Sequence, residues 1–135
     1  MDLRMIQHIG IPVVNPQESL AFYAKLGFVP VMESPFTQDN GEGFCWMVRK
    51  GDITIELYQL PACELDGVAR RRDGHIDHVA FDVDDIDDVF AELREKGFDI
   101  QEPAPKALPF WEKGCRYINI IGPAGERLEF CQIIK

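Results

Sequence analysis

The stretch IQHIGI at residues 6–11 returns as IDHVAF at residues 76–81, at an offset of 70 with no gap. Each stretch places a histidine third, His8 in the first and His78 in the second. The same register continues along both copies and pairs Val13 with Val83, Ala21 with Ala91, Gly27 with Gly97 and Phe28 with Phe98. The chain is therefore a tandem repeat of one structural unit.

Each copy closes with a glutamate inside an apolar strand, Glu56 in the first and Glu129 in the second. The repeat therefore supplies two histidines and two glutamates, which are ligands for a borderline divalent ion such as Ni(II), Co(II), Zn(II), Mn(II) or Fe(II). We predict that His8, Glu56, His78 and Glu129 form one metal site. A glutamate that loosens from the ion, Glu129 or Glu56, would act catalytically by moving a proton.

The alternation of side chains along a strand supports this site. His8 lies on the face opposite to Ile9 and Ile11, and Glu129 lies opposite to Leu128 and Phe130. We therefore expect the polar groups on the concave face of a curved sheet and the apolar core behind it, under the helices.

Both copies predict the same order of elements, βαβββ, in the α+β class. In the first copy, Asn15 and Pro16 begin a helix whose apolar stripe is Leu20, Phe22, Tyr23 and Leu26. The predicted strands of this copy are 6–14, 28–32, 44–49 and 53–60. The second copy repeats this with a strand at 76–83, a helix from 84 to Gly97, an extended segment at 98–101, and a final hairpin, 116–121 and 127–134, turned at 122–125. We expect one domain, 1–135, with module one at 1–60, a connector at 61–75 and module two at 76–135.

Composition excludes several classes of function. The net charge of −9 and the pI near 4.7 argue against binding nucleic acid or an anionic membrane. The 46% hydrophobic content is that of a soluble globular protein, expected in the cytoplasm. Residues 70–72 form a basic run, Arg-Arg-Arg, which is either a solvated loop or a contact for a substrate anion.

The chain resembles the vicinal oxygen chelate superfamily, which includes glyoxalase I, methylmalonyl-CoA epimerase, extradiol dioxygenases and bleomycin-resistance proteins. The resemblance lies in HIGI at 8–11, FYAKLGF at 22–28, IEL at 55–57, HVAFDV at 78–83, and GPAG at 122–125 before LEF at 128–130. It implies two tandem βαβββ modules in a cup-shaped, mostly antiparallel sheet around a divalent metal ion. It also implies a homodimer that binds a small-molecule substrate.

Within that superfamily the set His, Glu, His, Glu is similar to glyoxalase I, and implies a lyase or isomerase of the lactoylglutathione lyase type. Two departures leave the thiol open, because Pro12 and Leu60 replace an arginine and an asparagine common in the glutathione-using enzymes. Three alternatives stay open: a methylmalonyl-CoA-type epimerase, an extradiol dioxygenase, and a non-catalytic protein that binds an antibiotic or another small molecule.

A proline-rich stretch ends at residue 109 and leads into an aromatic pair, Phe110 and Trp111. We expect this segment to cover the cup, with the two rings excluding water and Lys113 or Arg116 meeting a substrate anion. The alternative interpretation is a packed loop without a role in catalysis.

Overall fold

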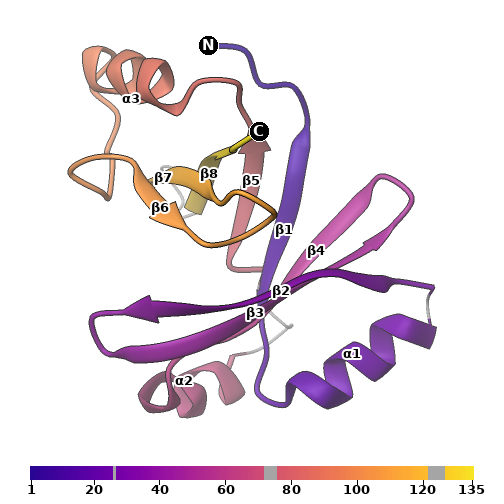
Figure 1. The fold of residues 1–135 in the computed structure, drawn as a ribbon. Helices are drawn as coiled ribbons and strands as arrows, with labels where there is room; N and C mark the ends of the chain where they lie inside the picture. The colour runs from indigo at the N-terminus through magenta and orange to yellow at the C-terminus, as the bar shows by residue number, and fades with distance from the viewer. Residues whose placement is uncertain (26, 72–75, 122–126) are drawn as a thin grey trace. The chain divides into compact units, whose positions relative to one another are not determined.

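The computed structural model describes residues 1–25, 27–71, 76–121 and 127–135. The chain divides into two compact units (Figure 1). We call His8–Asp77 the first-copy unit, and Met1–Gln7 together with His78–Lys135 the second-copy unit. The first seven residues thus belong with the second copy of the repeat. There, backbone hydrogen bonds join Arg4 N to Asp82 O and Asp82 N to Met5 O.

The first-copy unit contains a mixed sheet with helix α1, followed by two short helical segments. Its elements are β1 (Ile6–Pro12, whose first two residues belong to the second-copy unit), α1 (Pro16–Lys25), β2 (Val29–Gln38), β3 (Gly41–Lys50) and β4 (Ile53–Gln59). The strand order is β2-β3-β4-β1, with β1 and β4 parallel and the other neighbours antiparallel. A short η1 (Ala62–Glu64) and α2 (Leu65–Ala69) follow, in the stretch predicted as a connector.

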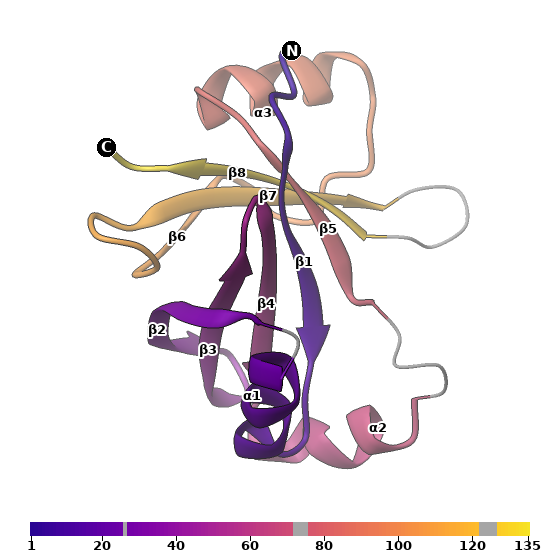
Figure 2. The same cartoon turned by 90° about the vertical axis from the view of Figure 1, so that its right-hand side faces the viewer.

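The second-copy unit repeats this arrangement. Its elements are β5 (His78–Asp82), α3 (Ile86–Glu95), β6 (Lys106–Leu108), β7 (Cys115–Ile121) and β8 (Arg127–Ile133), in the strand order β5-β8-β7-β6. The pair β5 and β8 is parallel, while β7 lies antiparallel beside β8 (Figure 2). The predicted α+β class, the two βαβββ modules and the mostly antiparallel pairing are confirmed.

Helices α1 and α3 begin with a side-chain cap at the same position of the repeat. Asn15 Oδ1 accepts a hydrogen bond from the backbone N of Glu18 at 3.2 Å. Seventy residues later, Asp85 Oδ1 accepts from the backbone N of Asp87 and of Asp88, at 2.9 and 3.1 Å. These oxygens satisfy amides that have no partner within the helix, so each cap fixes where its helix begins.

Both helices also end in the same way. Gly27 and Gly97 have φ angles of 94° and 75°, in the left-handed region that glycine adopts without steric cost. Beyond each glycine a backbone N–H donates to the carbonyl five positions back at 3.1 Å, from Phe28 to Tyr23 and from Phe98 to Leu93. This is the Schellman pattern of helix termination. The repeat seen in the sequence therefore extends to individual backbone hydrogen bonds.

Each unit has its own core. One core contains Val13, Phe28, Val48, Ile55 and Leu57, and the other contains Val83, Ile86, Val89, Leu93, Ile118, Ile120 and Phe130. Because Ile55 and Leu57 face one core and Phe130 faces the other, Glu56 and Glu129 project from the opposite face of each sheet. The predicted separation of the core from the polar face is therefore present in each unit.

The two helices differ in how much they bury. Helix α3 buries Ile86, Val89 and Leu93, whereas α1 has no fully buried residue. The positions in α1 that correspond to Ile86 and Val89 are occupied by Pro16 and Ser19. These small or polar residues offer little apolar surface to a core, so α1 is held mainly by half-buried side chains.

The predicted stripe of α1 is wrong at Phe22, whose side chain is 59% exposed. Leu20 and Tyr23 do pack against the core of the first-copy unit, while Leu26 lies outside the described residues. Phe22 lies two residues after Leu20 and one residue before Tyr23. Residues one or two positions apart in a helix point to different faces, so Phe22 does not share the face on which Leu20 and Tyr23 pack.

Other predictions differ at their boundaries. Strand β2 continues to Gln38, beyond the predicted end at residue 32, because it pairs along its length with β3. The predicted turn at 122–125 and residue 72 of the basic run lie outside the described residues. Among the described helices none has the length and apolar character needed to cross a membrane.

Candidate functional site

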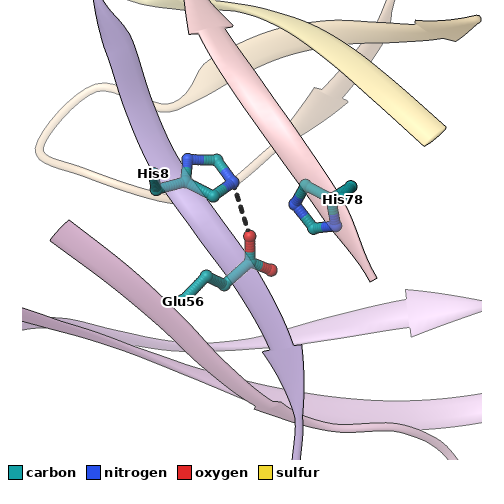
Figure 3. Close-up of side chains that lie close together, drawn as sticks. All are labelled: His8, Glu56 and His78. Carbon is teal, nitrogen blue, oxygen red and sulfur yellow. Dashed lines mark ion pairs between the residues drawn. The ribbon is translucent and has the colours of Figure 1, made fainter. Parts of the chain in front are cut away.

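The first-copy unit brings His8 and Glu56 together. Gly10 of β1 pairs with Glu56 of β4 in parallel register, and His8 shares a face with Gly10 two residues away. Both side chains are buried, and His8 Nε2 lies 2.7 Å from Glu56 Oε2 (Figure 3). The structure thus brings a first-strand histidine and a last-strand glutamate into contact in this unit, and metal binding by the two stays a prediction.

The second-copy unit brings His78 and Glu129 together by the same geometry. Ala80 of β5 pairs with Glu129 of β8, and His78 lies two residues before Ala80. Both side chains are again buried, with His78 Nε2 at 3.6 Å from Glu129 Oε2. The two units therefore present equivalent buried His–Glu pairs, one close and one more open.

These two distances fit ligands of a divalent ion. Metal–ligand bonds of about 2.1 Å place two ligand atoms about 3.0 Å apart at right angles and about 3.4 Å apart at the tetrahedral angle. The observed separations of 2.7 and 3.6 Å lie on either side of these values. Imidazole nitrogen with carboxylate oxygen is also the ligand chemistry that such ions accept. Each pair therefore fits half of a metal site with small movements of its side chains.

A residue that the sequence interpretation missed lies beside Glu129. Asn119 of β7 is the direct partner of Glu129 in the antiparallel register, so both side chains point to the same face. The carboxylate of Glu102 fixes Asn119 by accepting two hydrogen bonds, from its backbone N at 2.6 Å and from its side-chain Nδ2 at 2.8 Å. The signal that could have revealed it is one amide between two isoleucines in an apolar strand.

The same face of β8 carries Cys131, two residues after Glu129. A hydrogen bond with the Cys115 thiol and burial together raise the pKa of Cys131 well above its usual value. A nucleophilic cysteine needs a lowered pKa that favours the thiolate. Cys131 therefore has the character of a packed structural thiol.

The residues predicted to cover the site are placed in the loop between β6 and β7. Phe110 is buried, Trp111 is half-buried, and Lys113 is exposed. Trp111 has a φ of 67°, in the left-handed region that a bulky residue rarely adopts. Such backbone strain persists where the surrounding structure holds it, and is common in segments that shape a binding site. A role for these residues in substrate binding stays a prediction.

Arg116 is engaged with helix α3. Its Nη1 and Nη2 donate to the carboxylate of Asp87 at 2.6 and 2.9 Å. This bidentate bond lowers the pKa of Asp87 and raises that of Arg116. A substrate anion would have to compete with Asp87 for the guanidinium. In the basic run, Arg71 lies 3.7 Å from the carboxylate of Asp77.

Comparisons with known proteins place this geometry in context. A model of the Glyoxalase/Bleomycin resistance protein/Dioxygenase superfamily matches residues 5–130. The uncharacterized protein YwkD of Bacillus subtilis (strain 168) is 31% identical over 102 residues, which cover 75% of this chain and 78% of YwkD. The crystal structure of the hypothetical protein BH1468 from Bacillus halodurans C-125 is similar at 25% identity and a TM-score of 0.76, covering 97% of this chain and 95% of that one.

A further similar structure is methylmalonyl-CoA epimerase from Mycobacterium tuberculosis. It is 20% identical, with a TM-score of 0.80, over 96% of this chain and 88% of the epimerase. At that identity the likeness shows a shared fold and leaves the reaction open.

Proposed function

Since the chain belongs to the glyoxalase/bleomycin resistance protein/dioxygenase superfamily, which its sequence motifs resemble, we propose that it is a cytoplasmic, metal-dependent lyase or isomerase of the glyoxalase I type. It would move a proton at a carbon next to a carbonyl. The observation that carries this proposal is the pair of equivalent buried His–Glu contacts, His8 with Glu56 and His78 with Glu129. A protein that only sequesters a ligand has no need of two such pairs.

The four side chains together would hold one divalent ion, Ni(II), Co(II), Zn(II), Mn(II) or Fe(II), and leave further positions for a substrate. The proposal applies equally to pairs from one chain and to pairs contributed by two chains of a homodimer. When bound, the ion would withdraw electron density from a substrate carbonyl and make the neighbouring C–H bond more acidic.

The chain's own residues would then divide the work. The two imidazoles would bind the ion through Nε2. Their positions are fixed, because both histidines are buried and lie on paired strands. Glu56 Oε2 lies 2.7 Å from its histidine. Glu129 Oε2 lies farther from its own, at 3.6 Å from His78, and has the polar Asn119 as its direct cross-strand neighbour. We therefore assign the proton transfer first to Glu129, which would accept the proton and return it to the adjacent carbon.

A second candidate is an epimerase acting on an acyl-CoA, which the likeness to the Mycobacterium tuberculosis enzyme favours. It uses the same proton abstraction but returns the proton to the same carbon from the opposite face. Glu56 and Glu129 would then act as a pair, one as base and the other as acid. Glutathione is the less favoured thiol for the lyase, because Pro12 and Leu60 stand where its contacts would be expected.

The first experiment measures metal content after reconstitution of the metal-free protein. We expect one tightly bound ion per chain, since each chain contributes two His–Glu pairs. Binding by His8→Ala and by His78→Ala should be much weaker. Gln7→Ala, next to His8 in the chain, is the matched control and should bind metal as wild type does. The proposal is wrong if wild type binds no stoichiometric metal, or if both histidine variants bind it equally well.

A second experiment identifies the reaction by running it in D₂O. A hemithioacetal of methylglyoxal and methylmalonyl-CoA are the two probes. Deuterium should enter the carbon next to the carbonyl of the true substrate, with rearranged product from the first probe or unrearranged product from the second. Oxygen uptake with a catechol, without deuterium exchange in either probe, would instead assign a dioxygenase.

Co-expression tests where the two pairs meet. If each site forms across a homodimer, coexpressed His8→Ala and His78→Ala chains regain one intact site per mixed dimer, and metal binding returns in part. If each chain forms its own site, the mixture binds no better than the variants alone. Either result is compatible with the proposed chemistry, and the comparison decides whether the site forms within one chain or across a homodimer.

A further inference from the structure

We propose that Asn119 Oδ1 is a ligand-binding group: it accepts a hydrogen bond from an N–H or O–H that the substrate carries next to its metal-chelating oxygens. The inference rests on the proposed function, because it needs a ligand bound beside Glu129. It adds a requirement on the substrate that neither the fold nor the His–Glu pairs impose. The geometry that points to it lies entirely within the second-copy unit.

The orientation of the Asn119 amide is fixed. Glu102 accepts from Asn119 Nδ2 at 2.8 Å through one carboxylate oxygen and from the Asn119 backbone N at 2.6 Å through the other. An ionised carboxylate can only accept hydrogen bonds, so the –NH₂ end of the amide must face Glu102. The carbonyl end, Oδ1, is therefore directed away from Glu102, and the reversed orientation would set oxygen against oxygen.

Oδ1 is a buried acceptor that lacks a partner within the described part of the chain. The Asn119 side chain is 7% exposed. Buried amide oxygens in folded proteins are almost always hydrogen-bonded, and exceptions cluster where a ligand or a fixed water completes the set. The structure thus presents a preformed acceptor whose complement must come from outside the described chain.

The position of this acceptor connects it to the candidate metal site. Asn119 and Glu129 are direct partners across β7 and β8, so their Cβ atoms are about 5 Å apart on one face. In the first copy, the direct partner of Glu56 across β3 and β4 is Met47, a buried apolar residue. Glu129 therefore has a hydrogen-bond acceptor beside it, whereas Glu56 has an apolar side chain beside it.

This asymmetry selects a class of ligand. A chelating compound with a donor next to its chelating oxygens, such as a hydroxy-carbonyl compound or a hydroxamate, satisfies Oδ1. A compound of the same shape with a methyl group there leaves the acceptor buried and unpaired. Loss of that hydrogen bond should weaken binding by about 5- to 100-fold.

The test uses two hydroxamates that chelate through the same two oxygens. Acetohydroxamate has an N–H next to them, and N-methylacetohydroxamate has a methyl group instead. Calorimetric titration of the Zn(II)-loaded protein should give acetohydroxamate the higher affinity, by about tenfold. Asn119→Leu keeps the volume of the side chain but removes the acceptor, so this preference should disappear in the variant. A clash with the methyl group alone would survive that substitution.

A second variant tests the role of Glu102 as a positioning residue. Glu102→Gln keeps the size of the side chain but can offer its own N–H, so either end of the Asn119 amide can then face it. We expect the preference for acetohydroxamate to fall, with Zn(II) affinity unchanged. A purely structural role for Asn119 and Glu102 would change thermal stability and leave the ratio of the two affinities as in wild type.

The outcomes separate this inference from the proposed function. Failure of the wild-type protein to bind Zn(II) overturns the proposed function, and the inference with it. Normal Zn(II) binding with equal affinity for the two probes, or with neither probe bound, overturns the inference alone, because a fixed water or a purely structural arrangement then accounts for Oδ1. A preference that Asn119→Leu retains does the same.

Discussion

The two copies of the repeat share a backbone plan and differ in what they place on it. Cap, glycine terminus, parallel pairing of the first and last strands, and His–Glu pair recur at equivalent positions. The side chains around them do not, because α3 buries three apolar residues and α1 none, and Asn119 stands where the first copy has Met47. Backbone signals have thus been kept in both copies, while packing and polarity have diverged.

The difference between the two His–Glu pairs suggests a division of labour. The closer pair, at 2.7 Å, has an apolar neighbour beside its glutamate, whereas the more open pair, at 3.6 Å, has a fixed amide beside it. An apolar neighbour keeps water away from a carboxylate that stays bound to the ion. A polar neighbour can stabilise a carboxylate whose charge changes during the reaction. The first copy would anchor the ion, and the second would carry the chemistry.

The largest predicted effect is on the two glutamates. Glu129→Gln should lower the rate of deuterium exchange by about 10²- to 10⁴-fold, because an amide cannot accept the substrate proton. Glu56→Gln keeps a ligand oxygen at the anchoring pair and should lower the rate by about tenfold or less. Exchange is followed by NMR in D₂O at saturating metal.

The metal content of both variants serves as the control, since a loss of the ion would lower the rate for another reason. Equal losses in the two variants at full metal content would contradict the division of labour. Such a result would favour the epimerase, in which both glutamates handle the proton.

The second prediction compares the two helices. Leu93→Ala should lower the free energy of unfolding by about 2–5 kcal/mol, because it removes a fully buried side chain and leaves a cavity in the core of the second-copy unit. Leu20→Ala in α1 removes a half-buried side chain and should cost less, about 1–2 kcal/mol. Urea denaturation followed by circular dichroism measures both. Equal losses would show that α1 contributes as much packing as α3, contrary to their burial.

The sequence predicted the features that depend on local rules. The order βαβββ, the start of α1 at Asn15, the end of α3 at Gly97 and the facing of His8 and Glu129 follow from periodicity and from residues with special backbone preferences. The burial of α1 did not follow. A stripe of apolar residues shows which face could be buried, but Phe22 shows that tertiary packing decides which of them are.

The two His–Glu contacts were predictable from the sequence, because the repeat doubles each signal, while metal binding by these four residues stays a prediction. Asn119 has no equivalent polar residue in the first copy, so the repeat could not identify it. Its partner Glu102 lies in the proline-rich stretch, where no periodicity reveals which side chain will reach a strand edge. A contact between a loop and a strand edge depends on three-dimensional geometry, which the pattern of a sequence does not contain.

The third prediction uses the matched glycines that end the helices. Gly97→Ala should cost about 1 kcal/mol, because alanine must adopt the left-handed φ of 75°, although an added Cβ meets nothing within 4 Å. Gly27→Ala carries the same backbone cost, and its Cβ would lie 3.2 Å from Cε of Lys50, a flexible side chain that can move. The two losses, measured by urea denaturation, should therefore agree within a few tenths of a kcal/mol, about the scale of a small surface effect. A much larger loss at Gly27 would mean that Lys50 is held rigidly in the first copy.

The smallest effect concerns an ion pair that only the second copy can form, because Gln17 stands in α1 where Asp87 stands in α3. The hydrogen bonds from Arg116 lower the pKa of Asp87 below the usual value of an aspartate side chain. A carboxyl whose pKa is lower in the folded protein stabilises the fold above its unfolded pKa, and loses that contribution as the pH falls through the folded value. Asp87→Asn should therefore lower the urea midpoint slightly at neutral pH and have no effect in strong acid. Asp88→Asn, on the same helical turn, is the control for removing a carboxylate at this end of α3 and should change the urea midpoint at neutral pH less than Asp87→Asn does. A deficit of Asp87→Asn that persisted unchanged into strong acid would show that the contact with Arg116 acts through packing and not through charge.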